Sequence, residues 1–195
     1  MLRALIVWVS EAIIITGLCL LIYTAVQQNY REGLNDPQIQ MAEDAAAKLA
    51  SGAQISSVVP TQTVDLQASL SPWIAVYSSA GAPILSSGQL NGAPPQPPKG
   101  LFDDSTWLFT KVYETPQGKE TRITWQPQGD VRQAIVLIHL NSQGAAGYVV
   151  AGRNMREVED REGELSLFVG ITWLGLLCAT LIWQVIAVWA SRRVI

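Results

Sequence analysis

Two long apolar segments, one near each end of the chain, restrict its architecture more than any other feature of the sequence. The first covers residues 4–26 and the second covers residues 165–190, and only a few polar side chains interrupt them. Each is longer than the roughly 20 residues that an α-helix needs to cross a hydrocarbon core about 30 Å thick. The sequence therefore predicts two transmembrane helices on either side of a central region, residues 27–164.

The first apolar segment also has one property of a secretory signal peptide, because Arg3 directly precedes it. It is, however, longer than a typical signal core, and residues 24–27 (TAVQ) contain no good small-x-small cleavage site. Cys19 follows Leu18, where a lipoprotein site would have glycine or alanine. We therefore expect this segment to remain uncleaved as a membrane anchor.

Arginine residues next to the two segments indicate an orientation. Arg3 precedes the first segment, Arg192 and Arg193 follow the second, and such charges stay in the cytoplasm. Residues 1–3 and 191–195 are thus expected in the cytoplasm, and the central region outside it, in a protein of the cytoplasmic membrane. The central region contains neither of the two cysteines, so we expect no disulfide in it. It has no basic run, so nucleic acid is not an expected partner.

The central region begins with helical signals. The helix that continues from the first span is expected to weaken at Gly33 and Asn35. Asp36, a good N-cap, begins a second predicted helix that ends near Gly52. A further short helix is predicted at residues 64–70.

From Trp73 onward the pattern changes to the alternation that is typical of β-strands. Residues 73–88 predict a β-hairpin, and the four prolines of GAPPQPPKG, residues 92–100, favour a surface loop. Further strands are predicted within residues 106–114, 120–126, 133–140 and 147–152. The central region is therefore predicted to be α+β, with a long N-terminal helix and about five strands in a mostly antiparallel sheet.

Residues 151–164, AGRNMREVEDREGE, are predicted to form an exit helix that leads into the second span. Met155, Val158 and Leu165 recur at spacings of three and seven and form a narrow apolar seam. Together with Arg153 they are the predicted mechanical relay between the central region and the second span.

Three segments of the central region occur in a familiar order. They are the hairpin WIAVYSSAGAPILSSG, the strand GYVVAGR and the helix NMREVEDREGEL. Together they resemble the extracytoplasmic PAS-like sensor region of two-span bacterial receptors, notably sensor histidine kinases. The resemblance covers roughly residues 65–193 and implies a PAS-like domain that signals through its second span.

Receptors of that family continue past the second span into a linker and a kinase, whereas this sequence ends two residues after Arg193. Its one histidine, His139, lies in a predicted strand of the central region. We therefore expect no kinase activity and a separate output protein. The alternative is that the sequence is the front part of a longer receptor.

The resemblance also implies a ligand pocket, because a PAS-like sheet usually encloses a small ligand. The aromatic and basic residues of the predicted strands are the candidates: Trp107, Arg122, Trp125, Arg132 and Tyr148. Burial in an ordinary core explains the aromatic residues equally well, and arginines are common on strand edges.

Catalytic chemistry is not expected. The central region has one histidine, no thiol and no glycine-rich phosphate loop followed by a helix. His139 is expected to be structural, and Asp103 with Asp104 to form a solvated turn. The sequence thus predicts neither an enzyme, nor a metal site, nor a cofactor.

Glu11 is unusual because a carboxylate inside hydrocarbon costs roughly 2.5–3.5 kcal/mol unless it is paired, protonated or near the interface. Glu11 follows Arg3 by eight residues, and Gln184 precedes Arg192 by eight. At 1.5 Å per residue both lie about 12 Å from the cytoplasmic arginines. We expect them to meet between antiparallel helices, within one chain or across a dimer. The alternative is that Glu11 extends to the headgroups or contacts another protein.

Two functions are open at this point. One is a membrane-anchored sensor that relays a ligand or partner signal to a separate output protein. The other is an accessory or structural subunit of a membrane protein complex. The expected partners are the lipid bilayer, a second copy or a membrane or cytoplasmic signalling protein, and a small-molecule ligand.

Overall fold

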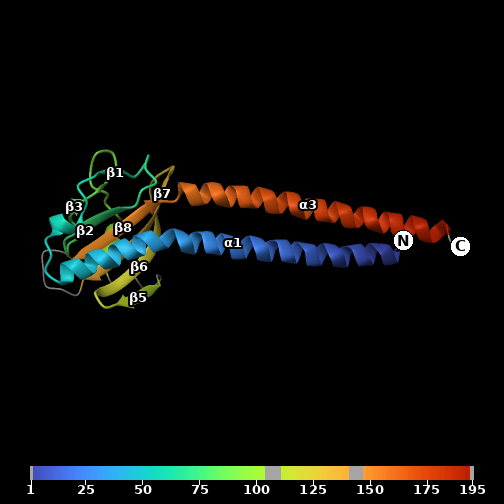
Figure 1. Ribbon diagram of the computed structural model, residues 1–195, viewed down its shortest axis with the longest axis horizontal. Coiled ribbons are helices and arrows are strands. Elements are labelled where there is room, and N and C mark those ends of the chain that lie inside the picture. The colour runs from blue at the N-terminus through green and yellow to red at the C-terminus, as the bar shows by residue number, and fades with distance from the viewer. Residues whose placement is uncertain (1, 104–110, 141–146, 194–195) are drawn as a thin grey trace. The chain divides into compact units, whose positions relative to one another are not determined.

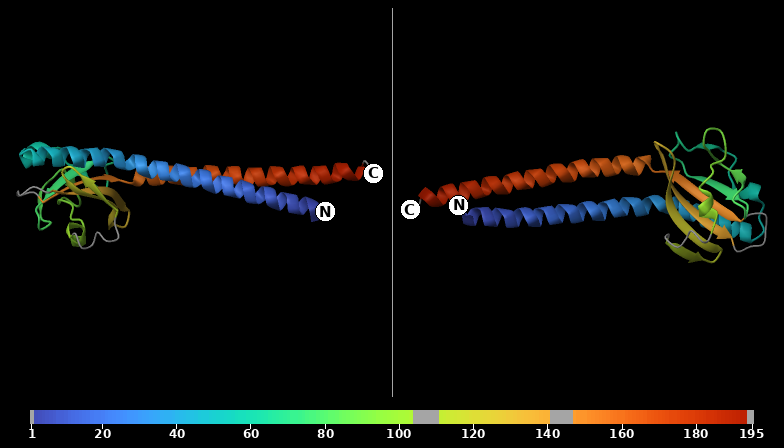
Figure 2. Two further views of the ribbon diagram at one scale, coloured as in Figure 1. Left: turned by 90° about the horizontal axis from the view of Figure 1, so that it is seen from below. Right: turned by 180° about the vertical axis from the view of Figure 1, so that it is seen from behind.

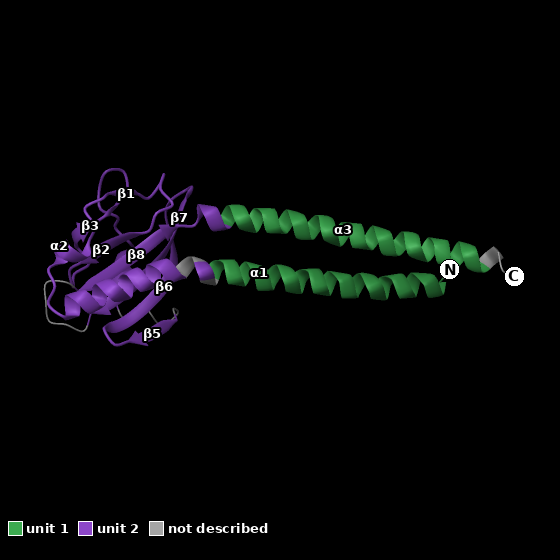
Figure 3. Cartoon of the chain, viewed as in Figure 1, with its two compact units in different colours: residues 1–31, 159–195 green, residues 32–158 purple. Residues whose placement is uncertain are grey.

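The computed structural model describes residues 2–103, 111–140 and 147–193, and the chain forms two compact units. Unit 1 combines Met1–Arg31 with Glu159–Ile195, and unit 2 is Glu32–Val158 (Figure 3). Two helices contribute to both units, α1 (Leu2–Ala50) and α3 (Arg156–Arg193) (Figure 1).

Unit 1 is a pair of helices that run side by side, formed by the first part of α1 and most of α3 (Figure 2). Both helices are long and apolar enough to cross a membrane. Their large apolar side chains are mostly exposed along the pair. A continuous apolar surface of this length suits lipid better than water, so the two predicted spans correspond to two helices of suitable length and composition.

Unit 2 is built on a six-stranded sheet in the order β3-β2-β8-β7-β6-β5, and each neighbouring pair is antiparallel. The strands are β2 (Trp73–Tyr77), β3 (Pro83–Ser86), β5 (Val112–Thr115), β6 (Gly118–Gln128), β7 (Val131–Leu140) and β8 (Tyr148–Asn154). The α+β prediction is therefore confirmed, although this sheet has six strands instead of about five. Of the strand predicted within residues 106–114, residues 106–110 lie outside the described part.

A second, two-stranded parallel sheet joins β1 (Val64–Asp65) to β4 (Gly88–Gln89). The short helix predicted at residues 64–70 is therefore wrong. The N–H of Val64 donates to Ser87 O at 2.7 Å, and the N–H of Leu66 donates to Gln89 O at 2.9 Å. These long-range bonds hold the segment beside β4 in an extended conformation, which a helix does not allow. Unit 2 also contains a short helix, α2 (Ile55–Val58), and a 3₁₀ turn, η1 (Lys99–Phe102).

One face of the large sheet is covered by the outer part of α1 and by the segment around α2. Small side chains line this part of α1 and lie against branched residues of the central strands. The buried cluster consists of Ala42, Ala45, Ala46, Val59, Ile74, Val76, Val136, Ile138, Leu140, Val149 and Ala151. Alanine brings the helix close to the sheet and removes apolar surface from water on both sides.

The helix α1 is continuous, so the break predicted near Gly33 is wrong. Pro37 lies inside it, where the fixed φ of proline is helical and its missing N–H removes one backbone hydrogen bond. Burial of Ala42, Ala45 and Ala46 against the sheet offsets this loss. Tertiary packing of one helix face outweighs the local signals that favour a break.

The opposite face of the sheet is covered by chain segments from the first half of unit 2 and by η1. Its buried cluster contains Leu66, Trp73, Ala75, Tyr77, Leu101, Trp125, Val131, Ile135, Leu137, Tyr148 and Val150. The phenol of Tyr77 donates to Pro95 O at 2.6 Å, and this burial raises its pKa above the ordinary value. The proline-rich loop is therefore bonded to the sheet at Pro95, while the rest of it is largely exposed.

Candidate functional site

The end of β8 and the start of α3 are hydrogen-bonded to two other segments of unit 2. The side-chain Nδ2 of Asn154 donates to Leu66 O at 2.9 Å, and the N–H of Met155 donates to Arg132 O at 2.9 Å. The N–H of Arg156 donates to Asn154 Oδ1 at 2.9 Å. Asn154 thus ends the strand and accepts one of the free donors of the first helical turn.

Arg153 adds a charged contact at the same junction. Its Nε donates to Leu70 O at 3.0 Å, and its Nη2 donates to Glu157 Oε2 at 2.8 Å. Both side chains are partly exposed, so the ion pair alone contributes little stability. Its geometry nevertheless links the last part of the strand, the first turn of the helix and the segment before β2.

Met155 and Val158 are buried beside Ala134 of β7. The structure therefore brings three of the four predicted relay residues, Arg153, Met155 and Val158, to one junction, while Leu165 lies further along α3 in unit 1. The exit helix was predicted from residue 151, which is wrong, because residues 151–154 belong to β8 and α3 begins at Arg156.

A buried polar network close to this junction was not predicted. Trp73 Nε1 donates to Gln133 Oε1 at 3.0 Å, and Gln133 Nε2 donates to Leu66 O at 3.0 Å. Leu66 O therefore accepts from both Gln133 and Asn154. One sequence feature could have indicated this network: the polar Gln133 directly precedes the apolar run AIVLIHL. An amide buried at the start of such a strand requires hydrogen-bond partners.

Two of the aromatic ligand candidates, Trp125 and Tyr148, lie in one buried cluster, on the face of the sheet opposite to α1. The Tyr148 hydroxyl donates to Phe102 O at 2.7 Å, and its ring stacks on His139 with centroids 4.5 Å apart. Phe102 contacts the same ring edge-on at 5.1 Å. The contacts with Phe102 hold η1 against the sheet, and the stack with His139 joins the neighbouring strands β7 and β8.

The basic candidates lie elsewhere. Arg122 pairs with Val136 in the register of β6 and β7, and therefore lies on the face that α1 covers. Its Nε donates to Glu120 Oε1 at 2.5 Å, and its guanidinium lies 4.1 Å over the Tyr113 ring. The Arg132 side chain is exposed, and Trp107 lies outside the described residues. The structure thus does not bring Arg122 to Trp125 and Tyr148.

Buried polar atoms without hydrogen-bond partners occur in the part of unit 2 that the structure describes. They are both amide atoms of Gln38, Glu120 Oε2 and Thr121 Oγ1. Gln38 lies on α1 one turn before the buried alanines, where the sequence shows only an ordinary helical glutamine. Among the described residues there is no group of three or more His, Cys, Asp or Glu that could hold a metal ion.

Polar contacts also join the two helices of unit 1. Gln184 Nε2 donates to Glu11 Oε1 at 3.2 Å and approaches Oε2 at 3.4 Å. Trp173 Nε1 donates to Thr16 Oγ1 at 2.9 Å. The structure therefore places Glu11 and Gln184 in contact within one chain, between helices that run antiparallel.

An ion pair joins the helices at the end of unit 1 that leads to unit 2. Arg31 Nε donates to Glu162 Oε1 at 2.6 Å, and Gln27 Nε2 approaches Glu162 Oε2 at 3.5 Å. The hydrogen bond with Glu162 is the main cause that raises the pKa of Arg31. No sequence pattern pointed to this pair, because the two residues are far apart in the chain.

Comparison with known proteins adds no relative. Neither protein-family models, nor curated proteins, nor solved structures match this chain.

Proposed function

We propose that this chain is a sensor-like protein of the cytoplasmic membrane. An extracytoplasmic PAS-like domain receives a ligand or partner signal, and the second span relays it to a separate output protein. The observation that carries the proposal is the junction of β8 with α3. β8 is a central strand between β2 and β7, and the helix that it leads into is itself apolar and long enough to cross a membrane.

The junction supports a mechanical relay because its contacts are short and come from several segments. Asn154, Met155 and Arg153 bond to three different parts of unit 2, and Val158 is buried there. A change in the sheet that moves β8 therefore also moves the first turn of α3. No flexible linker separates the sheet from the helix, since only Met155 lies between β8 and α3.

The PAS-like assignment is supported by the arrangement of unit 2. An antiparallel sheet carries a long N-terminal helix on one face and is covered on the other face by loops and η1. The aromatic candidates Trp125 and Tyr148 lie on the loop-covered face. A signal that acts on this face reaches β8 directly, because Tyr148 is the first residue of that strand.

The orientation follows from Arg3, Arg192 and Arg193 and is tested by labelling. In a variant with Cys19 and Cys178 replaced by alanine, a single cysteine is introduced by Ser51→Cys in unit 2 or by Ser191→Cys near the end of α3. A membrane-impermeant maleimide added to intact cells should label the first variant and not the second. The reverse result contradicts the orientation, and labelling of both variants contradicts a membrane-spanning arrangement.

Sensing is tested with the full chain in lipid nanodiscs and a broad set of metabolites. A ligand at 100 times its Kd should stabilise the protein by about 2.7 kcal/mol, which is visible as a rise in Tm. The same ligand should change the maleimide reactivity of the Ser191→Cys variant, and should lose this effect when the junction is broken.

A role as an accessory subunit is the second candidate, and the contact between Glu11 and Gln184 favours it. Gln184 gives Glu11 only a neutral partner within the chain, and ionisable groups inside a membrane usually face a bundle interior and pair there. If no metabolite shifts the Tm while a membrane protein copurifies in a fixed ratio, the accessory role replaces the sensing role.

A further inference from the structure

We propose that the helix pair of unit 1 binds a transmembrane helix of a different protein, and that this helix presents a lysine or arginine to Glu11. The inference rests on the proposed membrane placement and is independent of sensing. It names a class of membrane partner that is compatible with either proposed function.

The first observation is the charge at Glu11. Its two carboxylate oxygens are approached by a single donor atom, Gln184 Nε2, at 3.2 and 3.4 Å. Within the described residues Glu11 forms no ion pair. A neutral amide supplies a hydrogen bond to the carboxyl group but no positive charge that could pair with it. Carboxylates inside a membrane are normally paired with a cation or lie in a water-filled space.

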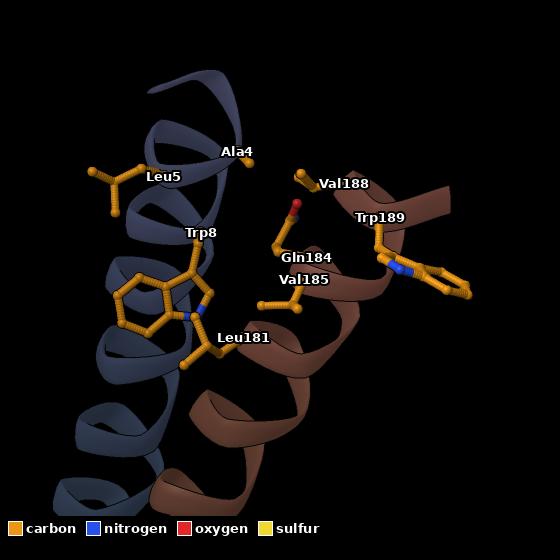
Figure 4. A pocket seen from close by; sticks show the side chains of 8 residues that line it. All are labelled: Ala4, Leu5, Trp8, Leu181, Gln184, Val185, Val188 and Trp189. Atoms are coloured by element: carbon orange, nitrogen blue, oxygen red, sulfur yellow. The ribbon is translucent and has the colours of Figure 1, made fainter. Parts of the chain in front are cut away.

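The second observation is a groove between the two helices that reaches Gln184, the residue whose amide donates to Glu11. It has a volume of about 370 Å³. Its walls are Ala4, Leu5 and Trp8 on α1 and Leu181, Val185 and Val188 on α3, with Gln184 between them. Figure 4 shows Gln184 pointing into the space between the helices, with Trp8 and Leu181 below it and Ala4 and Val188 above it.

Ala4 is a small residue in the wall of this groove, which also includes Trp189, and small residues allow another helix to approach closely in membranes. The groove therefore offers apolar walls for a helix and, at Gln184, a direct connection to the Glu11 carboxylate. Shape and charge thus point to the same occupant.

Charge complementarity distinguishes a basic helix from the other possible occupants. A lipid acyl chain has no group that could pair with a carboxylate. A second copy of this chain brings no basic residue to this level, because its bases nearest to the spans are Arg3, Arg31, Arg161, Arg192 and Arg193. The depth also defines the partner, whose basic residue should lie about 12 Å from the cytoplasmic end of its span.

The test uses the full chain in lipid vesicles and designed leucine-alanine helices as probes. Three probes are identical except for one residue, placed eight positions from the cytoplasmic end, which is lysine, glutamine or leucine. Association is measured by energy transfer between a fluorophore on the chain and one on the probe. The lysine probe should bind at least about tenfold more tightly than the leucine probe.

Variants of the chain assign the effect to Glu11. Glu11→Gln should remove the preference for the lysine probe, and Glu11→Lys should shift the preference to a probe that carries glutamate. Val188→Trp should fill the groove and weaken binding, whereas Ile13→Phe on the exposed side of α1 should leave binding unchanged. Gln184→Leu should keep the lysine preference, because the Glu11 carboxyl group remains.

Helical circular dichroism of each variant excludes loss of structure as the cause. Equal binding of the three probes, or equal binding of the lysine and glutamine probes, overturns the proposal. Self-association of the chain that disappears in Glu11→Gln without any probe identifies a second copy as the occupant and also overturns it. Failure of the membrane placement is detected separately, by the cysteine labelling.

Discussion

At the scale of single residues, the indole of Trp73 determines which side chains its neighbours can have. A Cβ built on Gly152 would lie 2.6 Å from Trp73 ring atoms, and one on Gly88 would lie 2.9 Å from them. Trp73 itself is fully buried and bonded to Gln133. The two glycines are therefore required by close approach of the ring and not by an unusual backbone conformation.

We expect Gly152→Ala to destabilise the protein by about 1–3 kcal/mol, because the added methyl group displaces the Trp73 ring. Gly129→Ala is the matched control, since no atom lies within 4 Å of a Cβ at that position. Urea unfolding of the full chain, followed by tryptophan fluorescence, measures both. Equal stability of the two variants contradicts the packing described for Trp73.

The side chain of Gln38 should also have a measurable effect on the stability of the protein. It is fully buried and neither of its amide atoms has a partner among the described residues. Gln38→Leu keeps a similar volume and removes the unpaired groups, so it should stabilise the protein by about 1–3 kcal/mol. Gln40→Leu, at an exposed position on the same helix, should change the stability by less than about 0.5 kcal/mol. A destabilising Gln38→Leu would show that the amide has a partner.

Tyr77 makes the stability of the folded protein depend on pH in the alkaline range. Burial raises its pKa in the folded protein above the ordinary value of 10.0. Its contribution to stability is therefore complete below pH 10 and is lost as pH rises above it, because the unfolded phenol ionises first. Tyr77→Phe should unfold with a smaller loss of stability between pH 9 and 11 than the unaltered protein, as measured by thermal denaturation. If the loss of stability with pH is the same in Tyr77→Phe and in the unaltered protein, Tyr77 is not the cause of that loss.

At the scale of elements, the junction of β8 with α3 shows where sequence patterns are sufficient and where they are not. The alternation of YVVAG predicted a strand, and the charged segment after it predicted a helix. The exit helix was predicted from residue 151, within the charged segment that Arg153 and Asn154 open. In the structure both residues are in β8, because Asn154 pairs with Gln133 in register. Long-range pairing decides the boundary, and one sequence does not display it.

The relay should depend on the first turns of α3. Val158→Asp places a charge in the buried cluster with Ala134 and Met155, and Gly163→Pro removes a helical hydrogen bond. Both should abolish the ligand-dependent change at Ser191→Cys and leave the fold of unit 2 largely intact. Asp160→Ala and Gly163→Ala are the controls, because position 160 is exposed and a Cβ at 163 meets no atom within 4 Å.

Circular dichroism and the Tm of each full-length variant separate lost coupling from lost folding. If Val158→Asp and Gly163→Pro transmit the change as well as the controls do, α3 is only a tether.

At the scale of the whole molecule, the sequence was sufficient for the two apolar helices and for the α+β class, because both depend on composition and period. The sequence was also sufficient to predict that Glu11 and Gln184 face each other, because the rise per residue of a helix converts a distance in sequence into a depth. It was not sufficient for the network around Leu66 O or for Gln38, because these depend on which segments the fold brings together. The aromatic candidates Trp125 and Tyr148 could be identified as strand residues, but their partners could not.

The strand order has a consequence for how the protein is made. β8 lies between β2 and β7, yet it is the last strand in the chain. The half of the sheet with β2 and β3 and the half with β5 to β7 therefore remain separate until the ribosome has synthesised β8. The apolar part of α3 follows soon afterwards, so the sheet can close only late in synthesis. Until then the unpaired edges of β2 and β7 are open to mispairing, so folding of unit 2 should depend on chaperones that protect strand edges.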